Sequence, residues 1–174
     1  MNTYHITVDL PEKYASLIGA IIVHWSYQER LLADLTSALL NVSIKHGRVA
    51  VRSPRADEYI TMIRQLMMLE GVECNSVNLN KLATHLRALD GIRNLVAHGI
   101  WFVDPTTEFP AVQNISGNWK PDPKGPKIAR RIIPEGVVID ESGFRKIITS
   151  IKSTIQTTHS AHTEIVKKLE ALRK

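Results

Sequence analysis

The chain has 174 residues, 44% of them hydrophobic, and 22 Lys and Arg residues against 17 Asp and Glu residues, which leaves a net charge of +5. This length suits one domain with a sizeable core, and the composition excludes a disordered or fibrous protein. The basic balance, with a pI of about 9.4, favours an anionic partner such as nucleic acid but identifies none.

We expect a cytoplasmic protein with no membrane span. The longest apolar run, residues 17–23, is far shorter than the roughly 18 residues that a spanning helix needs. The first residues lack the basic and apolar segments of a secretory signal. Cys74 is the only cysteine, so neither an internal disulfide nor a multi-cysteine zinc site can form, as is typical of a reducing compartment.

Two helices are predicted in the first part of the chain. The first begins after Asp9, whose spacing to Glu12 is that of a capping box, and it runs to about Asn41. The second begins where Ser53 provides a cap and Pro54 takes the first helical position, and it continues to Gly71. In the first helix the apolar residues recur every three or four positions, as in a helix that faces a core, at Ile18, Ile22, Trp25, Leu32 and Leu39.

Two further helices are predicted later in the chain. The third begins near Ser76 or Asn78 and carries a stripe of leucines into the segment GIRNLVAHG, residues 91–99. The fourth begins near Asp140 or Ser142. Its apolar side consists of Phe144, Ile147, Ile151, Ile155, Ile165 and Leu169.

The segment between the third and fourth helices has a different composition. It is rich in Pro and Gly, with short β-branched runs between turn signals, which predicts a strand pair or a small sheet. We therefore expect a mainly all-α fold. Residues 1–174 are predicted to form one domain, a four-helix up-down bundle with a small β-rich insertion, at about residues 100–139, before the last helix.

Two charged residues interrupt the apolar stripes. Glu29 lies between Trp25 and Leu32 on the first helix, and Arg93 follows the leucines of the third helix. Because an unpaired buried charge is costly, we expect Glu29 and Arg93 to lie close together across the bundle. A structural ion pair that fixes the helix register is one interpretation, although such pairs contribute little net stability. A reaction centre is the other.

His98 and Asn94 are four residues apart and therefore share a helix face. Arg93 lies about 100° from Asn94, so the three side chains spread over an arc of roughly 140°. That arc is wide for one compact site within a single chain. It fits better if a second copy of the protein faces it, or if the helix breaks at Gly99 and redirects His98.

The segment RNLVAHG at the end of a third amphipathic helix, combined with Glu29 inside the first, resembles the HEPN superfamily. These are small helical-bundle domains marked by Arg, four to six residues and then His, and many are metal-independent ribonucleases. The resemblance covers residues 10–98 and 140–172 and leaves the β-rich insertion out. Some toxin branches carry a tyrosine shortly after the histidine. Ile100, Trp101 and Phe102 stand there instead, which argues against regulation through such a tyrosine.

The resemblance implies an endoribonuclease that uses neither a metal nor a cofactor. In such a reaction the 2′-hydroxyl of the RNA attacks the adjacent phosphorus. His98 would act as general acid and base, and Arg93 would stabilise the negative charge on phosphorus. Asn94 would position the phosphate or His98, and Glu29 would orient Arg93. Relatives commonly form homodimers and act in toxin–antitoxin or phage-defence systems, which makes an antitoxin protein a further expected partner beside RNA.

The β-rich insertion contains a basic segment that forms a second candidate site. Its five cations are Lys120, Lys124, Lys127, Arg130 and Arg131. A solvated loop explains them, and an RNA-backbone clamp with salt-dependent binding is the functional alternative. His159 and His162 are three residues apart, but no further ligand stands at an obvious spacing, so we expect no metal site.

Two alternatives to the enzyme follow from the same residues. One is a catalytically inactive HEPN-like module that binds RNA or protein, in which the Glu29–Arg93 pair is structural. The other is a helical adaptor for a protein partner.

Overall fold

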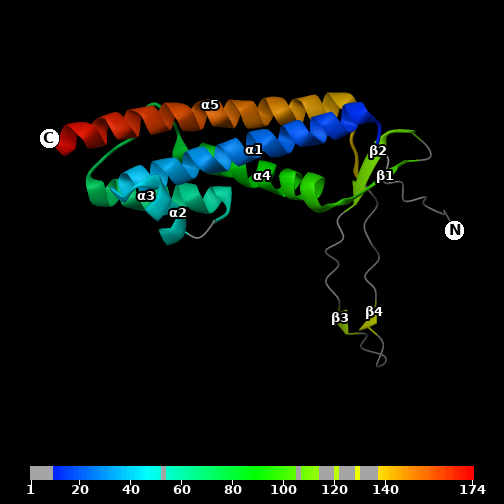
Figure 1. The fold of residues 1–174 in the computed structure, drawn as a ribbon, viewed down its shortest axis with the longest axis horizontal. Helices are drawn as coiled ribbons and strands as arrows, with labels where there is room; N and C mark the ends of the chain where they lie inside the picture. The colour runs from blue at the N-terminus through cyan, green and yellow to red at the C-terminus, as the bar shows by residue number, and fades with distance from the viewer. Residues whose placement is uncertain (1–9, 52–53, 105–106, 114–119, 122–127, 130–136) are drawn as a thin grey trace.

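The computed structural model describes residues 10–51, 54–104, 107–113, 120–121, 128–129 and 137–174 (Figure 1). Its helices are α1 (Glu12–Leu39), α2 (Ile44–Ala50), α3 (Ala56–Glu70), α4 (Leu79–His98) and α5 (Glu141–Leu172). Its strands are β1 (Ile100–Val103), β2 (Pro110–Gln113), β3 (Lys120–Pro121), β4 (Ile128–Ala129) and β5 (Val137–Val138). The chain is mainly helical and all described strands lie between α4 and α5, so the predicted fold class is confirmed.

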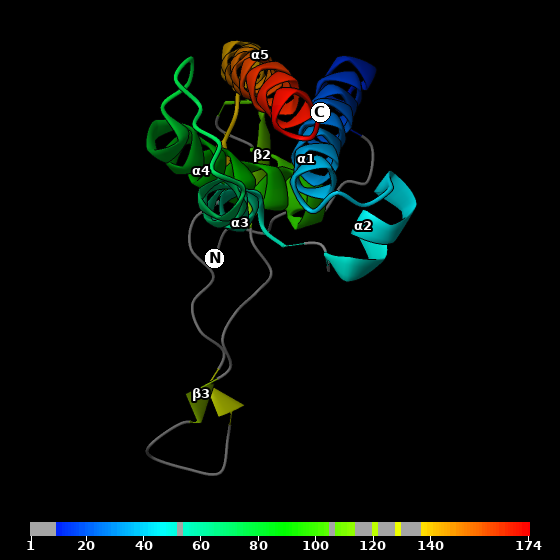
Figure 2. The same cartoon turned by 90° about the vertical axis from the view of Figure 1, so that its left-hand side faces the viewer.

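The two longest helices, α1 and α5, lie side by side over most of their length, with α3 and α4 beneath them (Figures 1 and 2). Trp25, Leu32, Phe144 and Ile165 are buried almost completely in the shared core. On α1 the core position is held by Ile21, whereas the predicted Ile22 is 39% exposed. Periodicity alone could not separate these two neighbours, because residues 17–23 are apolar on every side of the helix.

The helices do not alternate strictly in direction, which corrects the expected up-down order. Arg173, just beyond α5, donates hydrogen bonds to the Ala38 carbonyl at the end of α1 and to Glu70 at the end of α3. The C-terminal ends of α1, α3 and α5 therefore meet. Only α4 runs the other way among these four helices (Figure 1). The reason is the connection between α1 and α3, which contains the unpredicted helix α2. This connection leads the chain back along the bundle, so that α3 runs in the same direction as α1.

Helix α2 escaped the sequence-based prediction because it is short. It has seven residues, too few to show an amphipathic repeat. The Ser43 side chain caps it by accepting a hydrogen bond from the His46 N–H at 3.4 Å. Gly47 lets it approach α1 closely, because a β-carbon at this position would overlap the Ser37 side chain.

The caps of the later helices are where the sequence placed them, and those of the earlier helices differ. Asn78 accepts from the Lys81 N–H at 3.0 Å, and Asp140 from the Gly143 N–H at 2.7 Å. The structure begins α3 at Ala56, beyond Pro54, with Arg55 at the N-cap. At α1, Pro11 is the N-cap and makes no side-chain cap bond. Asp9 and Ser53 lie outside the described residues.

The strands form one three-stranded antiparallel sheet, ordered β1-β2-β5, and a separate β3–β4 pair. Strand β1 begins two residues after His98, so the larger sheet lies at the C-terminal end of α4 (Figure 1). Trp101 of β1 stacks on Phe144 of α5 at 5.9 Å between ring centroids, and its Nε1 donates to the Val96 carbonyl at 3.1 Å. The sheet therefore anchors the end of the helix that carries Arg93, Asn94 and His98.

Among the described residues no helix combines the length and apolarity needed to cross a membrane.

Candidate functional site

Arg93 and Glu29 meet across the bundle, as their positions in the two stripes predicted. Nη2 of Arg93 donates to Oε1 of Glu29 at 2.7 Å and to Oδ1 of Asp90 at 3.3 Å. The Arg93 side chain is 22% exposed and that of Glu29 is 39% exposed. The pair therefore lies at the edge of the core, where a ligand can reach it.

Trp25 fixes this pair from the side of α1. Its Nε1 donates to Oε1 of Glu29 at 2.8 Å, and its ring lies under the guanidinium of Arg93, 5.5 Å from centroid to Cζ. The ring face attracts the cation, while the hydrogen bond holds the carboxylate that Arg93 contacts. Both partners of the pair are thus held in one orientation.

Asp90 is a site residue that the sequence analysis missed. Its side chain is only 5% exposed and contacts two arginines, Arg93 at 3.3 Å and Arg55 at 3.4 Å. The available signal was its position three residues before Arg93, which places both on one face of α4. The apolar stripe did not indicate Asp90, because Asp90 directly follows Leu89 and does not occupy a position of the stripe itself.

The ion pairs continue along α3 and α4. Arg55 lies 3.6 Å from Asp57, and Nε of Arg87 donates to the other oxygen of Asp57 at 2.8 Å. The hydrogen bond from Arg87, assisted by the charges of Arg55 and Arg87, holds the pKa of Asp57 below its usual value although burial opposes this. Asp57 therefore remains a carboxylate at neutral pH.

A pocket of about 310 Å³ opens over this cluster. Its lining residues are Glu29, Pro54, Arg55, Tyr59, Asp90, Arg93 and Asn94. Burial, and to a lesser extent the charge of Glu29, raises the pKa of Tyr59, so its hydroxyl stays protonated and can donate. The pocket offers guanidinium, amide and hydroxyl donors above two carboxylates, which suits a polar or charged ligand.

His98 is not part of this pocket. It is the last residue of α4 and is exposed, and its side chain makes no hydrogen bond within the described part of the chain. Gly99 leaves the helix in an extended conformation, so the break comes after His98 and does not redirect it. The structure therefore groups Arg93, Asn94 and Glu29 and leaves His98 outside the pocket they line.

The predicted basic segment falls mostly outside the described residues. This holds for Lys124, Lys127, Arg130 and Arg131, whereas Lys120 is described only as part of β3, paired with Ala129 of β4. In the described ranges no three His, Cys, Asp or Glu side chains gather into a group that could hold a metal ion.

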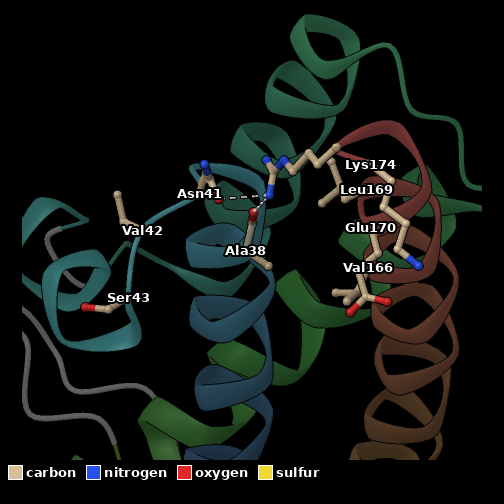
Figure 3. A pocket seen from close by; sticks show the side chains of 9 residues that line it. Ala38, Asn41, Val42, Ser43, Val166, Leu169, Glu170 and Lys174 are labelled. Atoms are coloured by element: carbon tan, nitrogen blue, oxygen red, sulfur yellow. Dashed lines mark hydrogen bonds between the residues drawn. The ribbon is translucent and has the colours of Figure 1, made fainter.

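A second pocket, of about 590 Å³, lies between the C-terminal ends of α1 and α5 (Figure 3). Arg173 closes one side of it by donating to the Ala38 carbonyl and to Oδ1 of Asn41, both at 3.2 Å. These bonds satisfy acceptors at the end of α1, as a helix C-cap requires. Arg173 therefore has a structural role in this pocket.

Comparison of the chain with models of protein families, with curated proteins and with solved structures gave no match in any of the three.

Proposed function

We propose that the protein is a metal-independent endoribonuclease of the HEPN type that acts as a homodimer. The observation that carries the proposal is the placement of Arg93 and Asn94. An arginine held by two carboxylates and an aromatic ring shares an open pocket with an amide, and an exposed histidine follows on the same helix. Cleavage through the 2′-hydroxyl needs a cation that stabilises the charge on phosphorus and a group that transfers protons, and Arg93 and His98 are residues of these two types.

The separation of His98 from the pocket supports a site built from two copies. Arg93 and Asn94 of one protomer would contact the scissile phosphate, and His98 of the partner subunit would reach the same phosphate. A two-fold dimer makes two such sites at once, because each contact occurs twice. Homodimerisation thus accounts for the wide arc between Arg93 and His98 on one helix.

The chemistry balances without a metal. A histidine in its neutral form takes the proton of the 2′-hydroxyl, the 2′-oxygen bonds to phosphorus, and the bond from phosphorus to the 5′-oxygen breaks. The 5′-oxygen leaves with a proton supplied by imidazolium. Products are a 2′,3′-cyclic phosphate and a 5′-hydroxyl. Arg93 neutralises the charge that develops on the non-bridging oxygens, and Asn94 donates a further hydrogen bond to the phosphate.

The proposal includes a cytoplasmic toxin–antitoxin or phage-defence role, with an antitoxin protein as a further partner, because the segment RNLVAHG resembles HEPN proteins. Glu29 acts through Arg93: it is a positioning residue, since it contacts the guanidinium and Trp25.

A second candidate function is an inactive RNA-binding module of the same fold. It is favoured by the fact that Nη2 of Arg93 already contacts Glu29 and Asp90, as in a structural ion pair. Such a protein would retain RNA in a salt-sensitive way without cutting it.

The test is cleavage of a labelled RNA by the purified chain in buffer that contains a chelator. We expect cleavage products that end in a cyclic phosphate, and loss of cleavage by a factor of about 100 or more in His98→Ala, the size of a lost general acid or base. His85→Ala is the matched control, because His85 is also an exposed histidine of α4. Equal rates for parent and His98→Ala would refute the assignment.

A further inference from the structure

Three arginines form a continuous row with two bridging carboxylates along α3 and α4. Nε of Arg87 contacts Asp57 at 2.8 Å, Asp57 contacts Arg55 at 3.6 Å, and Arg55 contacts Asp90 at 3.4 Å. Asp90 then contacts Arg93 at 3.3 Å. The row therefore begins on the surface at Arg87 and ends in the candidate active site at Arg93.

The row is layered, with its negative charges beneath its positive charges. The side chains of Asp57 and Asp90 are 10% and 5% exposed, whereas those of Arg55 and Arg87 are 57% and 66% exposed. A ligand that approaches from solvent therefore meets guanidinium groups first. The carboxylates lie underneath and keep the arginines in place.

The contacts within the row leave hydrogen-bonding capacity unused. Arg55 and Arg87 reach their carboxylates through Nε. Within the described part of the chain, the terminal Nη groups of both residues have no hydrogen-bond partner. Arginine carries five N–H donors in a planar fork, so each residue retains the pair of donors that matches two phosphate oxygens.

Stability alone gives little reason for keeping the two exposed arginines. An ion pair whose arginine lies mostly in solvent contributes little net stability. A guanidinium whose orientation is already fixed, in contrast, loses less side-chain entropy when it binds a ligand. The buried carboxylates thus hold the exposed side chains of Arg55 and Arg87 in positions from which they can bind an anion.

We propose that Arg55 and Arg87 bind the backbone phosphates of single-stranded RNA that leads to the scissile bond at Arg93. On α4, Arg87 and Arg93 are six residues apart, a rise of about 9 Å. The two arginines can therefore contact different phosphates of one strand. This inference rests on the proposed ribonuclease function and assigns to it the path of the substrate.

The experiment measures binding separately from cleavage. The probe is a fluorescently labelled single-stranded RNA of mixed sequence in which every 2′-hydroxyl is methylated, so that the attacking group is missing. Its affinity for the full chain is measured by fluorescence anisotropy at several salt concentrations. We expect Arg55→Gln and Arg87→Gln each to weaken binding about five- to tenfold, the effect of one lost charge-assisted contact. Each should also reduce the slope of log affinity against log salt by about 0.7.

Arg145→Gln is the matched control, because Arg145 is 68% exposed, is paired with Glu141 on the same helix, and lies on α5 away from the row. Its affinity should stay within about twofold of the parent, since it removes the same charge without a phosphate contact. Arg87→Lys keeps the positive charge near Asp57 and should lose less affinity than Arg87→Gln. Thermal unfolding of each variant shows whether the fold is retained.

Parental affinity in folded Arg55→Gln and Arg87→Gln would overturn the inference even if the protein cuts RNA. A loss confined to these two variants supports it. If they bind the probe weakly while the parent binds it tightly but never cleaves unmodified RNA, the row is a phosphate-binding surface and the ribonuclease proposal fails. The binding measurement therefore tests the arginine row, and cleavage of unmodified RNA tests the ribonuclease proposal.

Discussion

Asp90 connects the site to its surroundings at the scale of single residues. It contacts both Arg55 and Arg93, and its side chain is nearly inaccessible to solvent. Glu29 also contacts Arg93 but is much more exposed. The orientation of Arg93 therefore depends on one buried and one accessible carboxylate, and the buried one is shared with the arginine row.

We predict that Asp90→Asn lowers the free energy of unfolding by about 1–3 kcal/mol, because it removes the buried negative charge that two guanidinium groups contact and replaces one accepting oxygen with an N–H donor. Chemical denaturation at neutral pH measures this change. Glu141→Gln, which breaks an exposed pair with Arg145, should change stability by less than about 1 kcal/mol. If the two variants were equally stable, the description of Asp90 as the buried link of the network would be wrong.

At the scale of elements, Glu164 ties the connection between α3 and α4 to α5. Its carboxylate accepts from the backbone N–H groups of Asn75 and Ser76, both at 2.9 Å, and from Nζ of Lys168 at 2.8 Å. Lys168 also donates to the Glu73 carbonyl at 2.8 Å. These bonds fix the segment just before α4, the helix that carries Arg93, Asn94 and His98.

The same contacts make part of the stability dependent on pH. The backbone N–H of Asn75, followed by Lys168 and Ser76, holds the pKa of Glu164 far below its usual value of 4.5. Because the folded-state pKa is lowered, this stabilisation is complete above the unfolded pKa. It is lost as the pH falls towards the folded pKa.

We therefore predict that Glu164→Gln is less stable than the parent at pH 7 and that the difference shrinks steadily below about pH 4.5. Thermal unfolding across a pH series measures this convergence. Glu170→Gln, an exposed position on the same helix, should follow the parent at every pH. A difference between Glu164→Gln and the parent that stayed constant down to pH 2 would contradict the assignment.

The sequence predicted the parts of the fold and site that depend on local patterns. The long helices could be predicted because their apolar residues recur at regular spacing. The Glu29–Arg93 pair could be predicted because both charged residues interrupt these apolar stripes. Helix α2 has no such stripe and was not predicted. Because α2 was not predicted, the direction of α3 was predicted wrongly. The contacts of Arg55 with Asp57 and Asp90 depend on how the start of α3 meets α4. The direction of α3 and these arginine contacts both depend on how separate elements pack, which the spacing of residues along one helix does not determine.

At the scale of the whole molecule, the proposed active site requires two copies of the chain. One protomer collects Arg93, Asn94 and Glu29 around a pocket at α1, α3 and α4, while His98 remains exposed at the end of α4 beside the sheet. The proposed two-fold dimer gives each pocket the histidine of the other protomer. A variant tested by itself would lose activity both in this arrangement and in a site within one chain, so two variants must be combined.

Complementation between two inactive variants tests this central claim most directly. Arg93→Ala and His98→Ala chains are produced together, and RNA cleavage by the mixture is compared with each variant alone. Our account predicts that both variants alone are inactive. Equal mixing gives half mixed dimers, each with one intact site of two, so the mixture should regain about a quarter of the parental rate. A mixture that forms mixed dimers but stays inactive, or a His98→Ala chain that cuts RNA as fast as the parent, would contradict the account.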